Sequence, residues 1–139
     1  MNLYVLDTET TSADDDRGVC EIGWIRIDEN WNILETVESL IDPQKPISPA
    51  ASGVHGLVYE DVVNSPTLEE FFTLDAPGCY GRRITGPVVL IGHRIGFDRP
   101  AFEPYVDGEI LEIDTLRYIR QLYPDADNHQ LSTMKFQLN

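Results

Sequence analysis

Apolar and polar positions alternate over the first forty residues in the way that β-strands require. Strands are predicted over residues 3–6, 19–27 and 33–41, because residues two apart in a strand face the same side. The polar segments 11–18 and 28–32 separate these runs and predict a turn and a hairpin connection. Connections this short cannot form parallel crossovers, so we expect the three strands to be antiparallel.

The rest of the chain alternates between short helices and strands. Thr67–Leu74 predicts a short helix, with Thr67 as its N-cap and Glu70 completing a capping box. The other expected elements, in chain order, are an irregular segment over 42–66 with one helical turn after Ser48, a loop over 75–87, a strand over 88–91, a helix over 97–106 with Pro100 in its first turn, a strand over 109–113, a helix over 115–123 and a helical pattern over 128–138. Three antiparallel strands followed by strand-helix-strand-helix predict an α/β domain, a mixed sheet with helices packed on it.

The length and charge of the chain narrow its function. A chain of 139 residues is typical of one compact domain. Its 24 acidic and 10 Lys and Arg residues give a formal net charge of −14, which disfavours gripping a long DNA duplex through phosphates. An acidic protein still holds a nucleic-acid end if bound divalent cations reverse the local field, although acidity also serves solubility alone.

The N-terminus and the cysteines suggest a cellular location. The chain begins without a basic region, and none of its apolar runs reaches the length of a membrane span, so we expect a cytoplasmic protein with no membrane contact. Cys20 and Cys79 lie far apart and lack the paired spacing of a zinc site. We therefore expect two reduced thiols.

Asp7 and Glu9 stand two residues apart at the end of the first predicted strand. Side chains with this spacing face the same side, so two carboxylates meet at one place, where a bridging cation would relieve their repulsion. Mg²⁺ favours such oxygen ligands. Taken alone, so short a pattern favours an exposed acidic pair over a metal site.

Asp98 is a second candidate. The apolar run 88–91 is followed by Gly92 and a turn, which places Asp98 in the first turn of a helix, where negative charge is stabilised. If the first strand and the strand at 88–91 are neighbours, Asp98 approaches the pair Asp7–Glu9. The alternative, that Asp98 only caps its helix, is equally open.

Five segments of the chain are considered together, in sequence order: Asp7-Thr8-Glu9-Thr10-Thr11, Glu21-Ile22-Gly23, Val54-His55-Gly56-Leu57, Gly92-His93-Arg94-Ile95-Gly96-Phe97-Asp98 and Asp114-Thr115-Leu116. In their order and rough spacing they resemble a known family, the DnaQ-like (DEDDh) 3'-5' exonucleases. The resemblance covers nearly the whole chain and implies one domain of ribonuclease H-like fold over residues 1–139. It also implies metal-dependent hydrolysis of terminal phosphodiesters at 3' ends, with single-stranded DNA as the expected partner and nucleoside monophosphates as products.

The resemblance assigns the catalytic and metal-binding roles to Asp7, Glu9 and Asp98. In this family four carboxylates hold two Mg²⁺ ions, which Mn²⁺ can replace, and the ions stabilise the attacking and leaving oxygens. A histidine acts as general base on the attacking water.

Four further residues are candidate substrate contacts. Thr8 and Thr10 flank the carboxylates on the backbone stretch with which the family grips the 3' end. His55 matches a position near the terminal nucleotide, and closure of a loop by hydrogen bonds is an equally good interpretation. Arg94 stands where the family usually has Asn, and it either contacts a phosphate or is a solvated loop residue.

The last family motif, H-x(4)-D, has no match in this chain. The only histidine after Asp98 is His129, the fifth residue beyond it is Met134, and no acidic residue follows Asp127. His129 matches a position before the last helix of the family, where a structural role is expected, as it is for His93. We therefore expect a chain that lacks its C-terminal helix and last catalytic motif, in preference to a naturally degenerate domain.

Two other functions stay open. One is a catalytically incomplete or degenerate nuclease domain that binds nucleic-acid ends or a partner protein. The other is an RNA-directed enzyme, because the choice between DNA and RNA depends on contacts to the 2'-hydroxyl. A homodimer is also open, since relatives in the family often pair.

Overall fold

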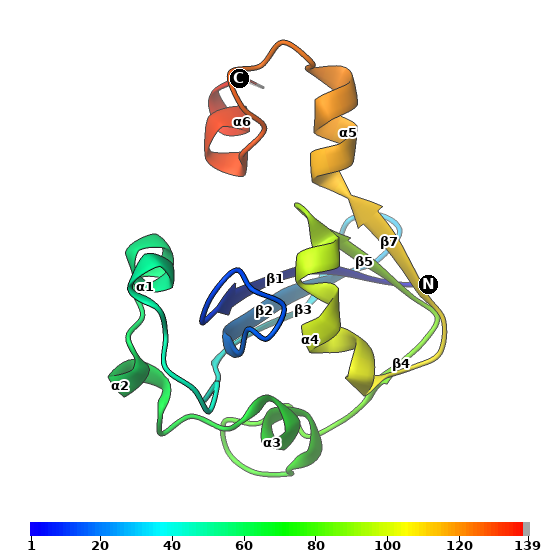
Figure 1. Cartoon of the computed structure of the whole chain (residues 1–139). Helices are drawn as coiled ribbons and strands as arrows, with labels where there is room; N and C mark the ends of the chain where they lie inside the picture. The colour runs from blue at the N-terminus through cyan, green and yellow to red at the C-terminus, as the bar shows by residue number, and fades with distance from the viewer. Residues whose placement is uncertain (138–139) are drawn as a thin grey trace.

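A five-stranded mixed sheet forms the centre of the computed structural model, which describes residues 1–137 (Figure 1). The strand order is β3-β2-β1-β5-β7. Strands β1 (Asn2–Thr10), β2 (Val19–Ile27) and β3 (Ile33–Leu40) are antiparallel neighbours, while β5 (Val88–Gly92) and β7 (Ile110–Asp114) run parallel to β1. The predicted mixed sheet is confirmed. Because β1 is longer than the predicted run, its last residues include both candidate carboxylates.

Short helices surround this sheet. They are α1 (Pro49–His55), α2 (Tyr59–Val62), α3 (Leu68–Thr73), α4 (Arg99–Phe102), α5 (Thr115–Leu122), α6 (Leu131–Gln137) and the 3-10 turns η1 (Ile95–Phe97) and η2 (Glu103–Tyr105), and a second small sheet pairs β4 (Ile84–Thr85) with β6 (Val106–Asp107). The segment 42–66 is more helical than predicted. Its helix α1 begins where the Ser48 hydroxyl accepts a hydrogen bond from Ala51 N–H, with a proline in the first turn.

The single helix predicted over 97–106 is wrong. The structure has η1, α4 and η2 there, in sequence. Pro100 occupies the first turn of α4, as predicted, but Pro104 follows after one turn, and a proline lacks the N–H that a helix interior needs. The capping box at Thr67 and Glu70 is confirmed. Residue 138, the last of the predicted helical pattern, lies outside the described residues.

One face of the sheet carries the core. The even-numbered residues of β1 and β2 turn toward α3 and α4, where an aromatic cluster fills the space between the layers. Trp24 is 2% exposed, and its ring stacks on that of Phe72 at 5.8 Å. The cluster includes Tyr4, Trp24, Phe71, Phe72, Tyr80 and Phe102.

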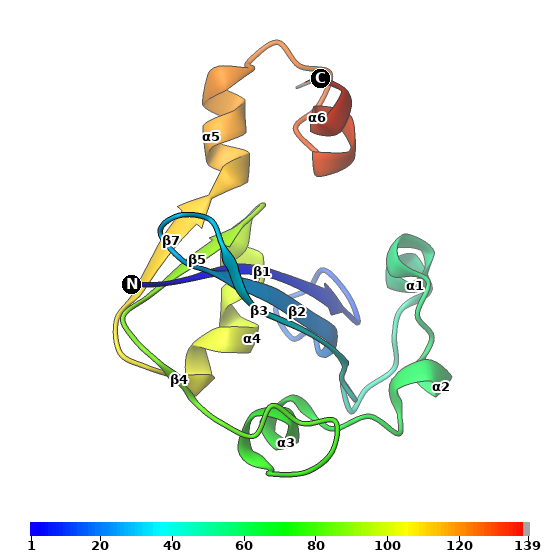
Figure 2. The same ribbon diagram turned by 180° about the vertical axis from the view of Figure 1, so that it is seen from behind.

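The opposite face is largely open. Among the described residues, no helix lies across β1, β2 and β3 in the view from behind (Figure 2). Val5, Ile25 and Ile113 keep 39%, 36% and 37% of their surface exposed there. Their pairing places these residues in one row across the sheet. Asp7 and Glu9 follow Val5 along β1 on the same face. None of the helices within residues 1–137 has the length and apolar character needed to cross a membrane.

Candidate active site

The last residues of β1 divide between the two faces of the sheet. Asp7 and Glu9 point to the open face, and Thr8 and Thr10 are buried on the core side. The neighbouring strand adds a further carboxylate, because Glu21 of β2 lies directly opposite Glu9. The pair predicted from the spacing of two residues is therefore present on one side of one strand.

Asp98 reaches this place from the loop that follows β5. The pairing of β1 with β5 stops at Val5 and Ile91, so β1 continues beyond its neighbour. At that edge the Thr8 N–H donates to Asp98 Oδ1 at 3.0 Å, and the Thr8 hydroxyl donates to the same oxygen at 2.6 Å. Asp98 is 4% exposed and makes no capping bond to α4, so the cap interpretation is wrong. The expected proximity of the first strand and the strand at 88–91 is confirmed.

Gly92 allows this approach. A Cβ built on Gly92 would lie 2.7 Å from Ile95 Cδ1 and 3.1 Å from the Leu6 carbonyl oxygen, so a larger residue would push the loop away from β1. Arg94, two residues after Gly92, has a φ of 69° and donates its N–H to Asp114 Oδ1 at 2.9 Å. The same oxygen accepts from Leu116 N–H at 2.9 Å, so Asp114 caps α5.

The negative charge of Asp7 acts on the other carboxylates near the end of β1 and raises the pKa of each. The pKa of Asp98 is raised to about 6, chiefly by burial and also by the charge of Asp7, while the hydrogen bond from the Thr8 hydroxyl lowers it. Partial burial and then the charge of Asp7 also raise the pKa of Glu9. The pKa of Glu21 is raised by burial and by the charges of Glu38 and Asp7. Asp7 itself, although accessible, has a pKa raised by partial desolvation.

The carboxylate oxygens of Asp7, Glu9 and Asp98 are the kind of ligand that a hard divalent cation prefers. In the described part of the chain, the number of ligands that lie close together is too small for a complete site. The ligands are oxygens, and a bound cation would favour their charged forms, which burial and mutual repulsion disfavour. Both bonds from Thr8 fall on Oδ1 of Asp98, which leaves Oδ2 outside that pair of bonds. Within residues 1–137, however, no three His, Cys, Asp or Glu side chains lie close enough together to hold an ion.

His55 closes a loop by hydrogen bonds. Its Nδ1 accepts from Leu57 N–H at 3.1 Å, so Nε2 carries the proton and donates to the Thr10 carbonyl at 3.0 Å. Neither ring nitrogen is left for a substrate. The ring instead lines a mostly apolar recess of about 270 Å³ beside Glu9, together with Val54 and Phe97.

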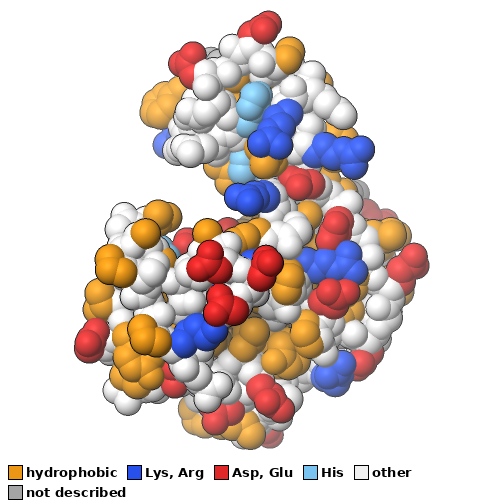
Figure 3. Space-filling view, viewed as in Figure 1, with side chains coloured by type: hydrophobic (Ala, Val, Ile, Leu, Met, Phe, Trp, Pro, Cys, Tyr) orange, Lys and Arg blue, Asp and Glu red, His pale blue; other side chains and the backbone are white. Residues whose placement is uncertain are grey.

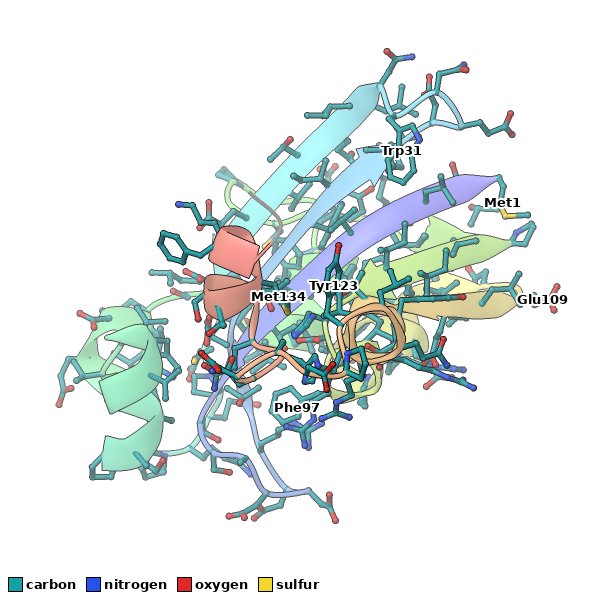
Figure 4. All side chains as sticks on the ribbon, turned by 90° about the horizontal axis from the view of Figure 1, so that it is seen from above. Met1, Trp31, Phe97, Glu109, Tyr123 and Met134 are labelled. Carbon is teal, nitrogen blue, oxygen red and sulfur yellow. The ribbon has the colours of Figure 1, made fainter. Side chains whose placement is uncertain are left out.

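The two later histidines fasten the segment before α6. His93 Nε2 donates to the His129 carbonyl at 2.6 Å, and His129 Nε2 donates to the Tyr123 carbonyl at 2.8 Å. Both contacts are structural, as expected for these residues. Met134, the fifth residue beyond His129, is 1% exposed and lies on α6 above the C-terminal part of β1 (Figure 4).

The surface is hollowed between the part formed by α5 and α6 and the rest of the molecule (Figure 3). Acidic side chains gather below this hollow, and histidine and basic side chains lie along its upper side. The hollow therefore has acidic groups on one side and basic groups on the other.

The sequence analysis missed two residues of the site. Arg17 donates to the carbonyl of Phe97 at 2.8 Å, which places a cation next to the Asp98 loop. Phe97 lines the recess that also holds His55. The only signal for Arg17 is a lone cation directly after three consecutive aspartates in the turn 11–18.

Comparisons with known proteins agree on one family. The RNase_T family, described as Exonuclease, matches residues 4–139. Exodeoxyribonuclease 10 of Escherichia coli is 29% identical over 133 residues, which cover 96% of this chain and 54% of that protein. The PolC-type DNA polymerase III of Caldanaerobacter subterraneus is 30% identical over 138 residues, which are 95% of this chain and 9% of that protein. The chain thus spans about half of the first relative and a small part of the second.

Solved structures give the same fold. Exonuclease X in complex with 5' overhanging duplex DNA matches with a TM-score of 0.71 and 26% identity, over 98% of this chain and 72% of that one. Exonuclease I of E. coli in complex with a dT13 oligonucleotide matches with a TM-score of 0.71 and 15% identity, over 96% of this chain and 35% of that one. The second match shows the fold alone.

Proposed function

The chain belongs to the RNase_T exonuclease family, and on that premise we propose that it is a metal-dependent 3'-5' exonuclease of DNA ends. The products would be nucleoside monophosphates. The single observation that carries the proposal is geometric: Asp7 and Glu9 face the same side of the end of β1, and Asp98, about 90 residues further on, is held at the edge of that strand by the N–H and the hydroxyl of Thr8. Such a repulsive cluster at one strand end is the arrangement that bound cations stabilise.

Asp7, Glu9 and Asp98 would hold the metal ions. Bound divalent ions, Mg²⁺ or Mn²⁺, supply charge neutralisation at the phosphate and a more acidic water. The chain's own contribution is position. Thr8 holds Asp98 through its N–H and its hydroxyl, so the third carboxylate stays at the edge of β1 beside the first two.

The recess next to Glu9 is the proposed place for the terminal nucleotide. It is lined by apolar and aromatic surface from Val54, His55 and Phe97, on which a base can stack. Thr8 and Thr10 would then contact the 3' end through backbone groups other than the Thr8 N–H and the Thr10 carbonyl, since these two groups and both side chains bond within the protein. Arg94, exposed above the turn, is the proposed phosphate contact.

DNA ends suit the charge of this protein better than long duplex does. A net charge of −14 offers little sequence-independent attraction to a phosphate backbone. Exonuclease X, which is 26% identical to this chain, was solved with a 5' overhanging duplex DNA. That complex supports an exposed DNA end as the substrate class.

A second function is favoured by the histidines. All three histidines of the chain donate to backbone carbonyls, and no described histidine takes the place of the family's general base. A domain with the carboxylates and without that base would bind a nucleic-acid end in the presence of divalent cations and hydrolyse it slowly or not at all. This is the proposed alternative.

One experiment separates the two. The 139-residue chain is incubated with 5'-labelled single-stranded DNA and with the matching RNA, in Mg²⁺, Mn²⁺ or EDTA. Asp7→Ala removes the central carboxylate, and Asp125→Ala removes an exposed acid elsewhere as the matched control. Cation-dependent shortening from the 3' end, lost only in Asp7→Ala, supports the exonuclease.

Cation-dependent binding of the DNA without shortening, again lost only in Asp7→Ala, supports the end-binding domain. Neither shortening nor binding in the unaltered chain would contradict both proposals. A stronger response to RNA than to DNA would correct the substrate class and leave the site unchanged.

A further inference from the structure

The turn between β1 and β2 has a firm base. Thr11 N–H donates to the Gly18 carbonyl and Gly18 N–H donates to the Thr11 hydroxyl, both at 2.9 Å. The Thr11 carbonyl accepts from Ser48 N–H, which ties the same point to the start of α1. Arg17 stands immediately before this base, so its side chain projects from a fixed position rather than from a loose loop.

The guanidinium of Arg17 is engaged on three sides. It donates from Nη2 to the Phe97 carbonyl at 2.8 Å and from Nη1 to the Asp14 carbonyl at 3.1 Å. Its Cζ lies 3.8 Å from the centroid of the Phe97 ring, a stacking distance. Figure 4 shows Phe97 close to the turn 11–18. Two of these three contacts are with Phe97, which lies 80 residues away in the sequence.

That segment carries Asp98. The carbonyl that Arg17 holds belongs to the peptide unit joining Phe97 to Asp98, and the carboxylate of Asp98 is held from the other side by Thr8. We propose that Arg17 is a positioning residue, which clamps Phe97–Asp98 against β1 and thereby keeps the Asp98 carboxylate beside Asp7. The effect of the clamp on metal binding rests on the proposed function of these carboxylates. The clamp itself consists only of contacts between residues of this chain.

The chemistry of the clamp requires arginine. A planar guanidinium stacks on an aromatic face and donates to two carbonyls at once, while the ammonium of lysine is a compact charge on a flexible stem. If Arg17 acted through its charge alone, replacing it would have the opposite effect on metal binding. A cation next to a carboxylate cluster weakens the binding of metal cations, so removing it would tighten that binding. The two roles are distinguishable by sign.

The first test uses the metal-free protein. Amide exchange measured by NMR reports on the Thr8 N–H, whose acceptor is Asp98 Oδ1. In Arg17→Met we expect the Thr8 amide to exchange about tenfold faster while the β1–β2 ladder is unchanged, because only the Asp98 loop loosens. Arg17→Lys keeps the charge and should fall between Arg17→Met and the unaltered protein.

Arg82 provides a matched control. It also stacks on an aromatic ring, with its Cζ 4.5 Å from the Tyr80 centroid, and it pairs with Glu35, far from Asp98. Arg82→Met should leave the Thr8 amide as it is. An unchanged Thr8 amide in Arg17→Met, in a protein whose far-ultraviolet circular dichroism confirms folding, would overturn the proposal.

The second test is a calorimetric titration of the protein with Mn²⁺ and no other ligand. Residues that support metal ligands change metal affinity by about 10- to 100-fold, so we expect Arg17→Met to bind about tenfold more weakly and Arg17→Lys to fall between Arg17→Met and the unaltered protein. Tighter binding by Arg17→Met with unchanged binding by Arg17→Lys would identify a charge effect and overturn the positioning role. If the unaltered protein binds no Mn²⁺, the proposed metal site fails, and the Thr8 amide still decides the role of Arg17.

Discussion

Replacing Asp98 with Asn should stabilise the metal-free protein above neutral pH. Asp98 is 4% exposed, and burial raises its pKa to about 6 from an ordinary 3.8. Folding therefore disfavours its charged form. Asn keeps an oxygen that can accept the N–H and the hydroxyl of Thr8 and carries no charge, so Asp98→Asn removes the cost and keeps the two hydrogen bonds.

The size of the effect follows from linkage. A pKa difference between 3.8 and about 6 corresponds to about 3 kcal/mol, at about 1.36 kcal/mol per pH unit. Because the folded-state pKa is the higher one, the cost in the unaltered protein is complete above pH 6 and absent below the unfolded value. The gain in unfolding free energy of Asp98→Asn should thus be about 2–3 kcal/mol at pH 8 and should disappear near pH 3.

Urea unfolding in EDTA at several values between pH 3 and pH 8 measures this gain. Asp125→Asn, which removes an exposed carboxylate, should change the unfolding free energy by less than about 0.5 kcal/mol. A gain for Asp98→Asn that is absent at pH 8, or equal at all pH values, would refute the burial argument. The same variant should also bind Mn²⁺ more weakly, so that stability and metal binding change in opposite directions.

Three further changes test the structure around the site. Thr8→Val removes a hydrogen bond to a charged carboxylate and should cost about 2 kcal/mol at pH 8 and less at pH 3, measured by urea unfolding. Phe72→Ala empties part of the core, where Phe72 is 0% exposed, and should cost about 4 kcal/mol in the same assay. His93→Ala frees the His129 carbonyl and should speed proteolysis of the 123–131 segment with little change in the core. Equal costs for Thr8→Val at both pH values would contradict its hydrogen bond to the charged Asp98. A small loss for Phe72→Ala would contradict its core packing, and unchanged proteolysis for His93→Ala would contradict its bond to the His129 carbonyl.

The sheet was predictable because alternation is a local signal. The limits of β2 are those of the predicted strand, and β1 and β3 differ from prediction only at their ends. The helices were harder to predict. Prolines made 42–66 look irregular, although Pro49 begins α1, and Pro104 divides the segment that was predicted as one helix.

The candidate site was predictable in its acids and not in their supports. The pair Asp7–Glu9 follows from spacing along one strand, and the approach of Asp98 follows from two strands being neighbours. The contacts of Thr8 with Asp98 and of Arg17 with Phe97 join residues 90 and 80 positions apart. No local pattern encodes such contacts, because they arise only when the turn and the loop meet at the edge of β1.

The most direct test of the proposed function is to follow which end of a single-stranded DNA is released first. The same oligonucleotide is labelled either at its 3' or at its 5' terminal nucleotide and incubated with the chain and Mn²⁺. We predict early release of the 3' label as a mononucleotide, none in EDTA and none with Asp7→Ala. Early release of the 5' label, or release that persists in EDTA or in Asp7→Ala, would contradict a 3'-5' exonuclease that depends on these carboxylates.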